Sequence, residues 1–277
     1  MMCLNSTCRR LAALCSLAAL LALPYPTHGQ SGDDPWPGIR EALFQARPIN
    51  DGATSLQIFA PNQADDAALV PISVRMPANI AAKASKLTLI IDRNPAPVAG
   101  TFIFGDAFRA SPDVGERSIA TRVRVDAFSR VRAVLELADG TLEMASKFVI
   151  GAGGCSAPAT KDPDEALASL GRTQMKLMKS AAHDAHWREI QVMIKHPNFT
   201  GMQMDKKTGS FTPAVFVNSI DVRQGTAPIL RIEGGISLSE DPNIRFTTGV
   251  AEDAGLEFGA TDTAGRTFYA AAVPDPS

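Results

Sequence analysis

The sequence predicts an all-β protein with two antiparallel β-sandwiches joined by a glycine-rich arm and a linker helix. Short runs of alternating apolar and polar residues, separated by turn residues, fill positions 56–150 and return at 189–271. Between them, residues 151–158 are too rich in glycine to continue a strand. The length of 277 residues also fits two domains of about 100 to 150 residues each.

The N-terminus has the pattern of a cleavable signal peptide. Arg9 and Arg10 precede an apolar run from Leu11 to Leu23, and small residues and prolines follow as far as Gly29. The run is shorter than the roughly 20 residues that a membrane-spanning helix needs. We therefore expect residues 1–29 to be removed on export to the periplasm, and we expect no membrane span.

Removal of the signal peptide changes both the charge and the cysteine count. It leaves 25 basic and 29 acidic residues, a formal net charge of −4, so no basic footprint for nucleic acid remains. It also removes Cys3, Cys8 and Cys15, so Cys155 has no partner for an intramolecular disulfide. A single cysteine in an oxidising compartment indicates intermolecular pairing, a covalent adduct or a reactive thiol.

The first sandwich is expected over residues 30–150. It begins with a short amphipathic helix over Trp36–Phe44, where Ile39 and Leu43 are four residues apart, and Arg47-Pro48 ends that helix. Ala138–Thr141 is expected to close a hairpin. The predicted strands are 56–60, 70–76, 87–91, 101–104, 119–125, 130–137 and 142–150.

The arm and the linker helix are expected over residues 151–186. The helix is predicted to start with Asp162 as N-cap and Pro163 in its first turn, with Leu167, Leu170, Met175 and Met178 as its apolar positions. A second, smaller sandwich is predicted over residues 187–277. Its predicted strands are 189–194, 214–217, 219–222, 229–232, 243–248, 255–261 and 267–271.

Cys155 is the residue to which the sequence assigns a function. A lone cysteine is usually a buried apolar residue, but its neighbours here are glycine, serine, alanine and proline, which indicates an exposed thiol. Gly151, Gly153 and Gly154 are expected to form an arm that reaches about 13 Å. No lysine, arginine or histidine lies within five residues to activate the thiol, which favours a passive carrier over an autonomous enzyme.

The chain resembles two bacterial sulfur-oxidation proteins. The motifs at Arg47–Gly52, Val70–Ile72 and Phe148–Cys155 resemble SoxY, the cysteine-bearing subunit of the thiosulfate-oxidation carrier. The motifs His196–Met202 and Asp241–Phe246, with Ile220 between them, are similar to its partner SoxZ. The fused order is similar to the SoxYZ-like carriers that are associated with quinoprotein dehydrogenases.

This resemblance implies an immunoglobulin-like fold for each sandwich. It also implies that Cys155 matches the cysteine on which SoxY carries sulfur intermediates. One departure concerns the arm, since SoxY ends in GGCGG, whereas here Ser156-Ala157-Pro158 and about 120 further residues follow Cys155. The arm is therefore tethered at both ends.

The function that the resemblance implies is that of a periplasmic carrier, which is not an enzyme and has no cofactor. Cys155 would hold a sulfur-containing or other thiol-linked intermediate, for example in thiosulfate oxidation. The expected partners are periplasmic redox enzymes, namely a quinoprotein dehydrogenase, c-type cytochromes and Sox-type enzymes.

Two alternatives from other classes stay open. The first is a non-catalytic accessory or metal-handling protein for a quinoprotein dehydrogenase, in which Cys155 makes a disulfide-linked dimer. His183 and His186 could share a helix face for copper, but no carboxylate or cysteine completes a known spacing, so no metal site is assigned. The second is an autonomous thiol enzyme, but no nucleophile motif surrounds Cys155 and no catalytic residue is assigned.

Overall fold

The protein is an all-β molecule with four short helices in its described part. The computed structural model describes residues 34–51, 54–109, 115–158, 163–179, 187–205, 207–250 and 255–272, so the expected signal peptide lies outside it. The elements are α1 (Trp36–Phe44), β1 (Ile49–Asp51), β2 (Gln57–Phe59), β3 (Val70–Met76), α2 (Ala78–Ala81), β4 (Ala84–Ile91), β5 (Val98–Phe104), α3 (Asp106–Arg109), β6 (Arg117–Val123), β7 (Ser129–Leu137), β8 (Leu142–Val149), α4 (Pro163–Ala168), β9 (Thr173–Lys179), β10 (Trp187–Ile194), β11 (Val217–Gln224), β12 (Ala227–Gly234), β13 (Asn243–Gly249), β14 (Leu256–Asp262) and β15 (Thr267–Ala272).

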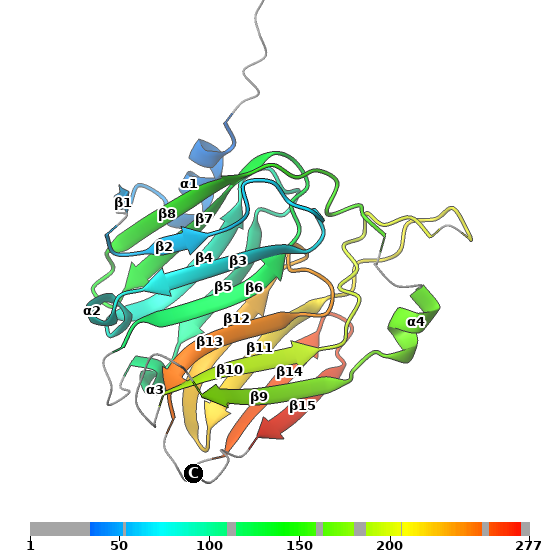
Figure 1. Cartoon of the computed structure of the whole chain (residues 1–277). Coiled ribbons are helices and arrows are strands. Elements are labelled where there is room, and N and C mark those ends of the chain that lie inside the picture. Colours follow the sequence, from blue (N-terminus) through cyan, green and yellow to red (C-terminus); the bar gives the residue numbers. More distant parts are fainter. Residues whose placement is uncertain are drawn as a thin grey trace, which may run out of the picture. The chain divides into compact units, whose positions relative to one another are not determined.

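Two sheets contain all of these strands, and each sheet takes strands from both predicted sandwiches. One sheet has nine strands in the order β1-β8-β7-β4-β5-β12-β11-β14-β15, and the other has six in the order β2-β3-β6-β13-β10-β9. The two halves of the chain join where β5 pairs with β12 and β6 pairs with β13, both antiparallel. In Figure 1 the cyan and green strands of the first half therefore continue into the yellow, orange and red strands of the second.

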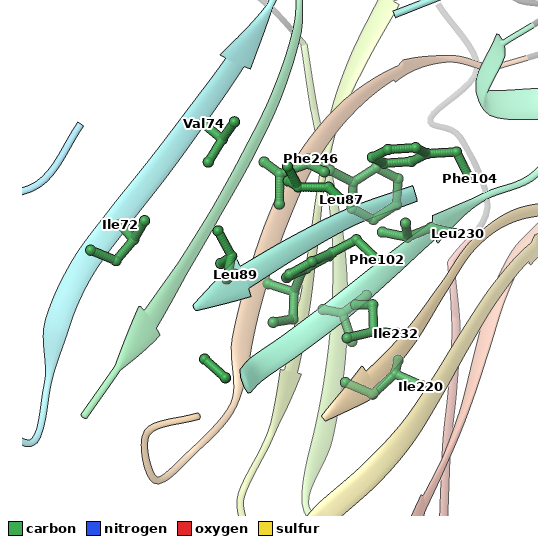
Figure 2. Packing of buried hydrophobic residues seen from close by; sticks show 14 of the residues in the cluster. Ile72, Val74, Leu87, Leu89, Phe102, Phe104, Ile220, Leu230, Ile232 and Phe246 are labelled. Carbon is green, nitrogen blue, oxygen red and sulfur yellow. The ribbon is translucent and has the colours of Figure 1, made fainter. Parts of the chain in front are cut away.

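The hydrophobic core lies between the sheets and is also continuous across the two halves. In β3, alternate residues Val70, Ile72, Val74 and Met76 are buried, as expected for a strand with one face on the core. Figure 2 shows the buried side chains of both halves together, drawn from the two sheets. Those labelled are Ile72, Val74, Leu87, Leu89, Phe102, Phe104, Ile220, Leu230, Ile232 and Phe246.

Most of the predicted elements are confirmed. Helix α1 and all seven strands of the first half form, because alternation and turn residues mark them clearly. The hairpin at Ala138–Thr141 also forms, with Gly140 at a φ of 86° and its N–H bonded to the carbonyl of Leu137. The division of the chain at residues 150 and 187 stays a prediction.

Two predictions in the second half are wrong. The predicted strand at 214–217 has only an isolated bridge between Val215 and Phe199 before β11 begins at Val217. The linker helix is much shorter than predicted and ends at Ala168, before Gly171 with its φ of 83°.

Met175 and Met178 therefore lie on β9, which pairs with β10. Met175 is buried in the core, so tertiary pairing overrides the loose helical spacing of these residues.

In the described part of the chain, no helix combines the length and apolar character that a membrane crossing requires.

At the junction of the two halves, the backbone of Gly105 lies close to the backbone of Pro228 and Ile229. We expect that adding a single methyl group at Gly105 destabilises the protein. Gly105 follows β5, and its N–H donates to the carbonyl of Ile229 at 2.8 Å. A Cβ at this position would lie 2.0 Å from the carbonyl oxygen of Pro228. Gly105→Ala is expected to lower the free energy of unfolding by more than about 2 kcal/mol, measured by urea denaturation.

Gly259→Ala is the matched control, because Gly259 lies on β14 with no atom within 4 Å of the added methyl group. Its free energy of unfolding should change by less than about 0.5 kcal/mol. Equal stability of the two variants would contradict the close packing at Gly105.

Candidate functional site

Cys155 lies in a turn that follows β8, and its side chain is buried. Its exposed fraction is 0%, whereas its neighbours Ala152, Ser156 and Pro158 are exposed. The sequence-based expectation of an exposed thiol is therefore wrong for this conformation. The reason is that the turn folds inward onto the body of the protein and buries the sulfur among segments that are distant in sequence.

Backbone hydrogen bonds hold this turn against the segment that follows β6. The N–H groups of Gly153 and Gly154 donate to the carbonyls of Asp126 and Val125 at 2.8 and 3.0 Å. The N–H of Cys155 donates to the carboxylate Oδ1 of Asp126 at 3.1 Å. The three consecutive N–H groups are thus all bound, and residues 151–158, which we call the Cys155 loop, are fixed rather than free.

The glycines of this loop allow close packing and a backbone turn. They do not form the extended arm that the sequence predicts. A Cβ on Gly154 would lie 2.1 Å from the carbonyl oxygen of Ala67, so only glycine fits there. Gly153 has a φ of 74°, which glycine adopts readily, and Gly151 is buried. The three residues assigned to the arm are therefore at the site, but they bind Cys155 to the body of the protein.

The second half of the chain supplies the other wall of the site. The hydroxyl of Thr200 donates to the carbonyl of Cys155 at 2.6 Å. Thr200 is itself held by Gln203, whose Oε1 accepts from the backbone N–H of Thr200 at 2.8 Å. Both side chains are buried. The Cys155 loop is therefore held by hydrogen bonds to residues of both predicted domains.

Arg124 connects these two walls. Its side chain is fully buried, with Nη1 donating to the carbonyl of Gly154 at 3.1 Å and Nη2 to the carbonyl of Asn198 at 3.4 Å. Its Nε and the Nε2 of Gln203 are buried without a hydrogen-bond partner among the described residues. Burial lowers the pKa of Arg124, and the charges of Glu240, Cys155 and Asp66 act in the opposite direction.

The surroundings of Cys155 disfavour its thiolate. The pKa of the thiol is raised to about 12, first because burial penalises the charged form and second because of the Asp126 carboxylate, whereas Arg124 opposes both. An ordinary thiol has a pKa of about 8.5, so Cys155 is protonated and weakly nucleophilic at neutral pH in this conformation. The fold therefore protects the thiol instead of activating it.

The histidine of the described region is not placed as a base for this thiol. His196 is buried, its Nδ1 accepts from the N–H of Asn198 at 3.0 Å, and its Nε2 lies 3.2 Å from Oδ2 of Asp262. Both ring nitrogens are therefore engaged. Burial lowers the pKa of His196, which keeps the ring neutral with its proton on Nε2. It orients the segment from His196 to Thr200 and is not a proton acceptor for Cys155.

The structure brings together no copper site in the described part of the chain. His183 and His186 lie outside the described residues, and within those residues no group of three or more potential metal ligands comes together. The hypothesis of a metal-handling protein therefore gains no structural support from the described part.

Sequence reasoning missed Arg124, Asp126 and Thr200 as site residues. Arg124 and Asp126 come 29 to 31 positions before Cys155, and Thr200 comes 45 positions after it. A search limited to the neighbours of Cys155 finds none of them. Only the resemblance of His196–Met202 to SoxZ pointed to the region of Thr200.

The packing of Gly154 gives a test of the closed loop. Gly154→Ala should force the loop away from Ala67 and Val125, break the hydrogen bonds of Gly153 and Gly154, and expose the thiol. We expect iodoacetamide to modify Cys155 more than about tenfold faster than in the unaltered protein, measured by intact mass over time. The control is Gly38→Ala, where no atom lies within 4 Å of the new methyl group. An unchanged rate in Gly154→Ala would show that the loop does not protect Cys155.

The raised pKa predicts how the thiol titrates and how stability depends on pH. Ultraviolet absorbance should show no thiolate in the folded protein near pH 10, whereas the denatured protein should titrate near its ordinary pKa of about 8.5. Between pH values of about 8.5 and about 12, only the unfolded state releases this proton. The free energy of unfolding should therefore fall as pH rises through this range.

Asp126→Asn keeps an oxygen acceptor for the Cys155 N–H and removes the negative charge. It should lower the pKa of Cys155 only part of the way, because burial, the larger cause, remains. Titration of the unaltered folded protein at the pKa of a free thiol would refute the burial.

Comparison with known proteins identifies two domains in the chain. The family model of the sulfur oxidation protein SoxY matches residues 40–155, and that of the sulphur oxidation protein SoxZ matches residues 175–273. The first match ends at Cys155 itself. A comparison with curated proteins found no match.

Solved structures give weaker likenesses. The sulfur carrier protein SoxY from Chlorobium limicola f thiosulfatophilum is 23% identical with a TM-score of 0.32, over 41% of this chain and 89% of that chain. A beta-glycosidase from Bacteroides vulgatus is 8% identical with a TM-score of 0.23, over 78% of this chain and 24% of that chain. A beta-glucuronidase from Parabacteroides merdae is 10% identical with a TM-score of 0.22, over 80% and 24%. Likenesses this weak say nothing about the activity of this chain.

The two family matches follow one another in a single polypeptide and together cover most of it. The strands of both matched regions share their sheets, and both regions build the surroundings of Cys155. The chain therefore belongs to the SoxYZ sulfur-oxidation proteins as a fusion of a SoxY and a SoxZ domain.

Proposed function

We propose that the protein is a periplasmic carrier that binds a sulfur-containing intermediate covalently on Sγ of Cys155 and presents it to partner redox enzymes. The observation that carries this proposal is the SoxY match that ends at Cys155, the one cysteine of the described residues. Carriage needs one accessible nucleophile and no catalytic base, and His196, the histidine of the described residues, is not placed as a base for Cys155.

Loading requires the Cys155 loop to open. A sulfur whose exposed fraction is 0% has no space for an added group, so the closed loop holds the free thiol only. Opening breaks the hydrogen bonds of the Gly153, Gly154 and Cys155 N–H groups and of the Gly154 and Cys155 carbonyls. At about 1 kcal/mol each, their loss costs several kcal/mol, which a partner enzyme can offset by binding the open loop.

The chemistry of the adduct determines the kind of partner. Joining the Cys155 thiol to a sulfane sulfur such as that of thiosulfate forms an S–S bond and releases two electrons and the thiol proton. Formation of this bond therefore needs an oxidant that takes the two electrons, and we propose that the loading partner supplies it. A c-type cytochrome or a quinoprotein dehydrogenase has the required chemistry, and we propose partners of these classes.

The proposal is tested by the mass of the protein as it occurs in its host. Protein isolated from the periplasm without reductant should carry a mass increment that reductant removes and that maps to Cys155. Cys155→Ser should carry no increment and should abolish the host's thiosulfate oxidation, because serine cannot form the S–S bond. Ser156→Ala is the matched control, since Ser156 is exposed beside Cys155, and it should behave as the unaltered protein.

Undiminished thiosulfate and alcohol oxidation in the Cys155→Ser host would refute the carrier role. An increment equal to the mass of a second chain would instead show that Cys155 makes a disulfide-linked dimer, in favour of the accessory function.

A further inference from the structure

A groove of about 520 Å³ lies on the outer face of the six-stranded sheet, where the two domains join. Its walls come from β2 and β3 of the SoxY domain, from β6, and from β13 and β10 of the SoxZ domain. Because β6 and β13 pair across the domain junction, the groove exists only in the assembled sheet. Its volume is within the range of about 300 to 1,000 Å³ typical of sites for small molecules.

The charged groups of the groove are all positive. Arg122 and Arg245 line it, and its lining contains no aspartate or glutamate. Arg122 donates through Nη2 to the carbonyl of Asp241 at 3.2 Å, and its Nε is buried without a hydrogen-bond partner among the described residues. A buried, unsatisfied guanidinium N–H is costly unless a ligand or water accepts from it.

The neighbouring carboxylates offset only part of the positive charge of the groove. Glu189 lies 3.5 Å from Arg245, and Glu116 lies 3.8 Å from Arg75 at the margin, where the side chains are partly exposed and such pairs are weak. Gln191 donates to Oδ1 of Asn243 at 2.9 Å, which leaves the amide N–H groups of Asn243 for another acceptor.

The opposite part of the groove is apolar and contains an exposed aromatic ring. Phe59, with 46% of its surface exposed, lines it together with Ala60, Pro61 and Pro71. The guanidinium of Arg75 lies 5.0 Å from the centre of the Phe59 ring, which holds the ring on the surface. An apolar surface beside two guanidinium groups suits a molecule with a flat apolar body and an anionic end.

We propose that this groove binds a small organic anion, with its carboxylate or sulfonate on Arg122 and Arg245 and its apolar body against Phe59 and the prolines. The groove does not include any residue of the Cys155 loop. The inference therefore does not depend on the carrier function.

The probe for the experiment is naphthalene-2-sulfonate, and its control is naphthalene-2-sulfonamide, which has nearly the same shape without the charge. Isothermal titration calorimetry on the purified protein should give one site per chain for the sulfonate, with a Kd below about 1 mM. The sulfonamide should bind at least about tenfold more weakly, because it lacks the charge-assisted hydrogen bonds.

Two groove variants and one control locate the site. Arg122→Gln should weaken sulfonate binding about tenfold or more, and Ala120→Phe should abolish it by filling the groove, which Ala120 lines. Arg245→Gln replaces Arg122→Gln if the latter fails to fold, as judged by thermal melting. The matched control is Arg223→Gln, since Arg223 is an exposed arginine on β11 of the other sheet.

Unchanged affinity in Arg223→Gln, together with the losses in the groove variants, would support the proposal. Absence of binding at about 5 mM sulfonate, equal affinity for the sulfonamide, or unaltered binding in Ala120→Phe would each overturn it. None of these outcomes bears on the mass increment at Cys155, so the two proposals can fail separately.

Discussion

The structure around Cys155 depends on one buried cation. Arg124 is fully buried, and its guanidinium binds the carbonyls of Gly154 and Asn198, one in each domain. A buried charge is tolerated only where hydrogen bonds compensate it, so the Cys155 loop and the segment at Asn198 stay in place together. Opening the loop removes one of the two acceptors from Arg124, which favours the closed state.

This arrangement separates storage of the thiol from its reaction. In the closed loop the thiol has a pKa of about 12 and is protonated, so it reacts slowly with oxidants and electrophiles. In an open loop the sulfur is in water and its pKa returns toward about 8.5, so a useful fraction of thiolate forms. The barrier to reaction is then mainly conformational. On the proposed carrier function, a partner that binds the open loop would both expose the cysteine and activate it, and the closed loop would protect the thiol from side reactions.

The sequence predicted the strands far better than the site. Strands such as β3 show an alternation that a local pattern reveals, whereas β9 was assigned to a helix because only its pairing with β10 distinguishes the two. The site is formed by contacts between Cys155 and residues at least 29 positions away, for which no local signal exists. The glycines were also compatible with two structures. Gly154 permits a close approach of the backbone to Ala67 as readily as it permits an extended arm.

The fusion of the two domains limits how far the sulfur can move. Cys155 lies six positions after Val149 at the end of β8 and eight positions before Pro163 at the start of α4. At roughly 3.3 Å per residue, the shorter connection allows Cys155 to lie at most about 20 Å from the end of β8. A free C-terminal arm is connected to the body of the protein at one end only, whereas this loop is connected at both ends. An enzyme that reacts with Cys155 must therefore place its reacting atom where both connections reach, which requires docking against the surface around the loop and a reaction site near its own surface.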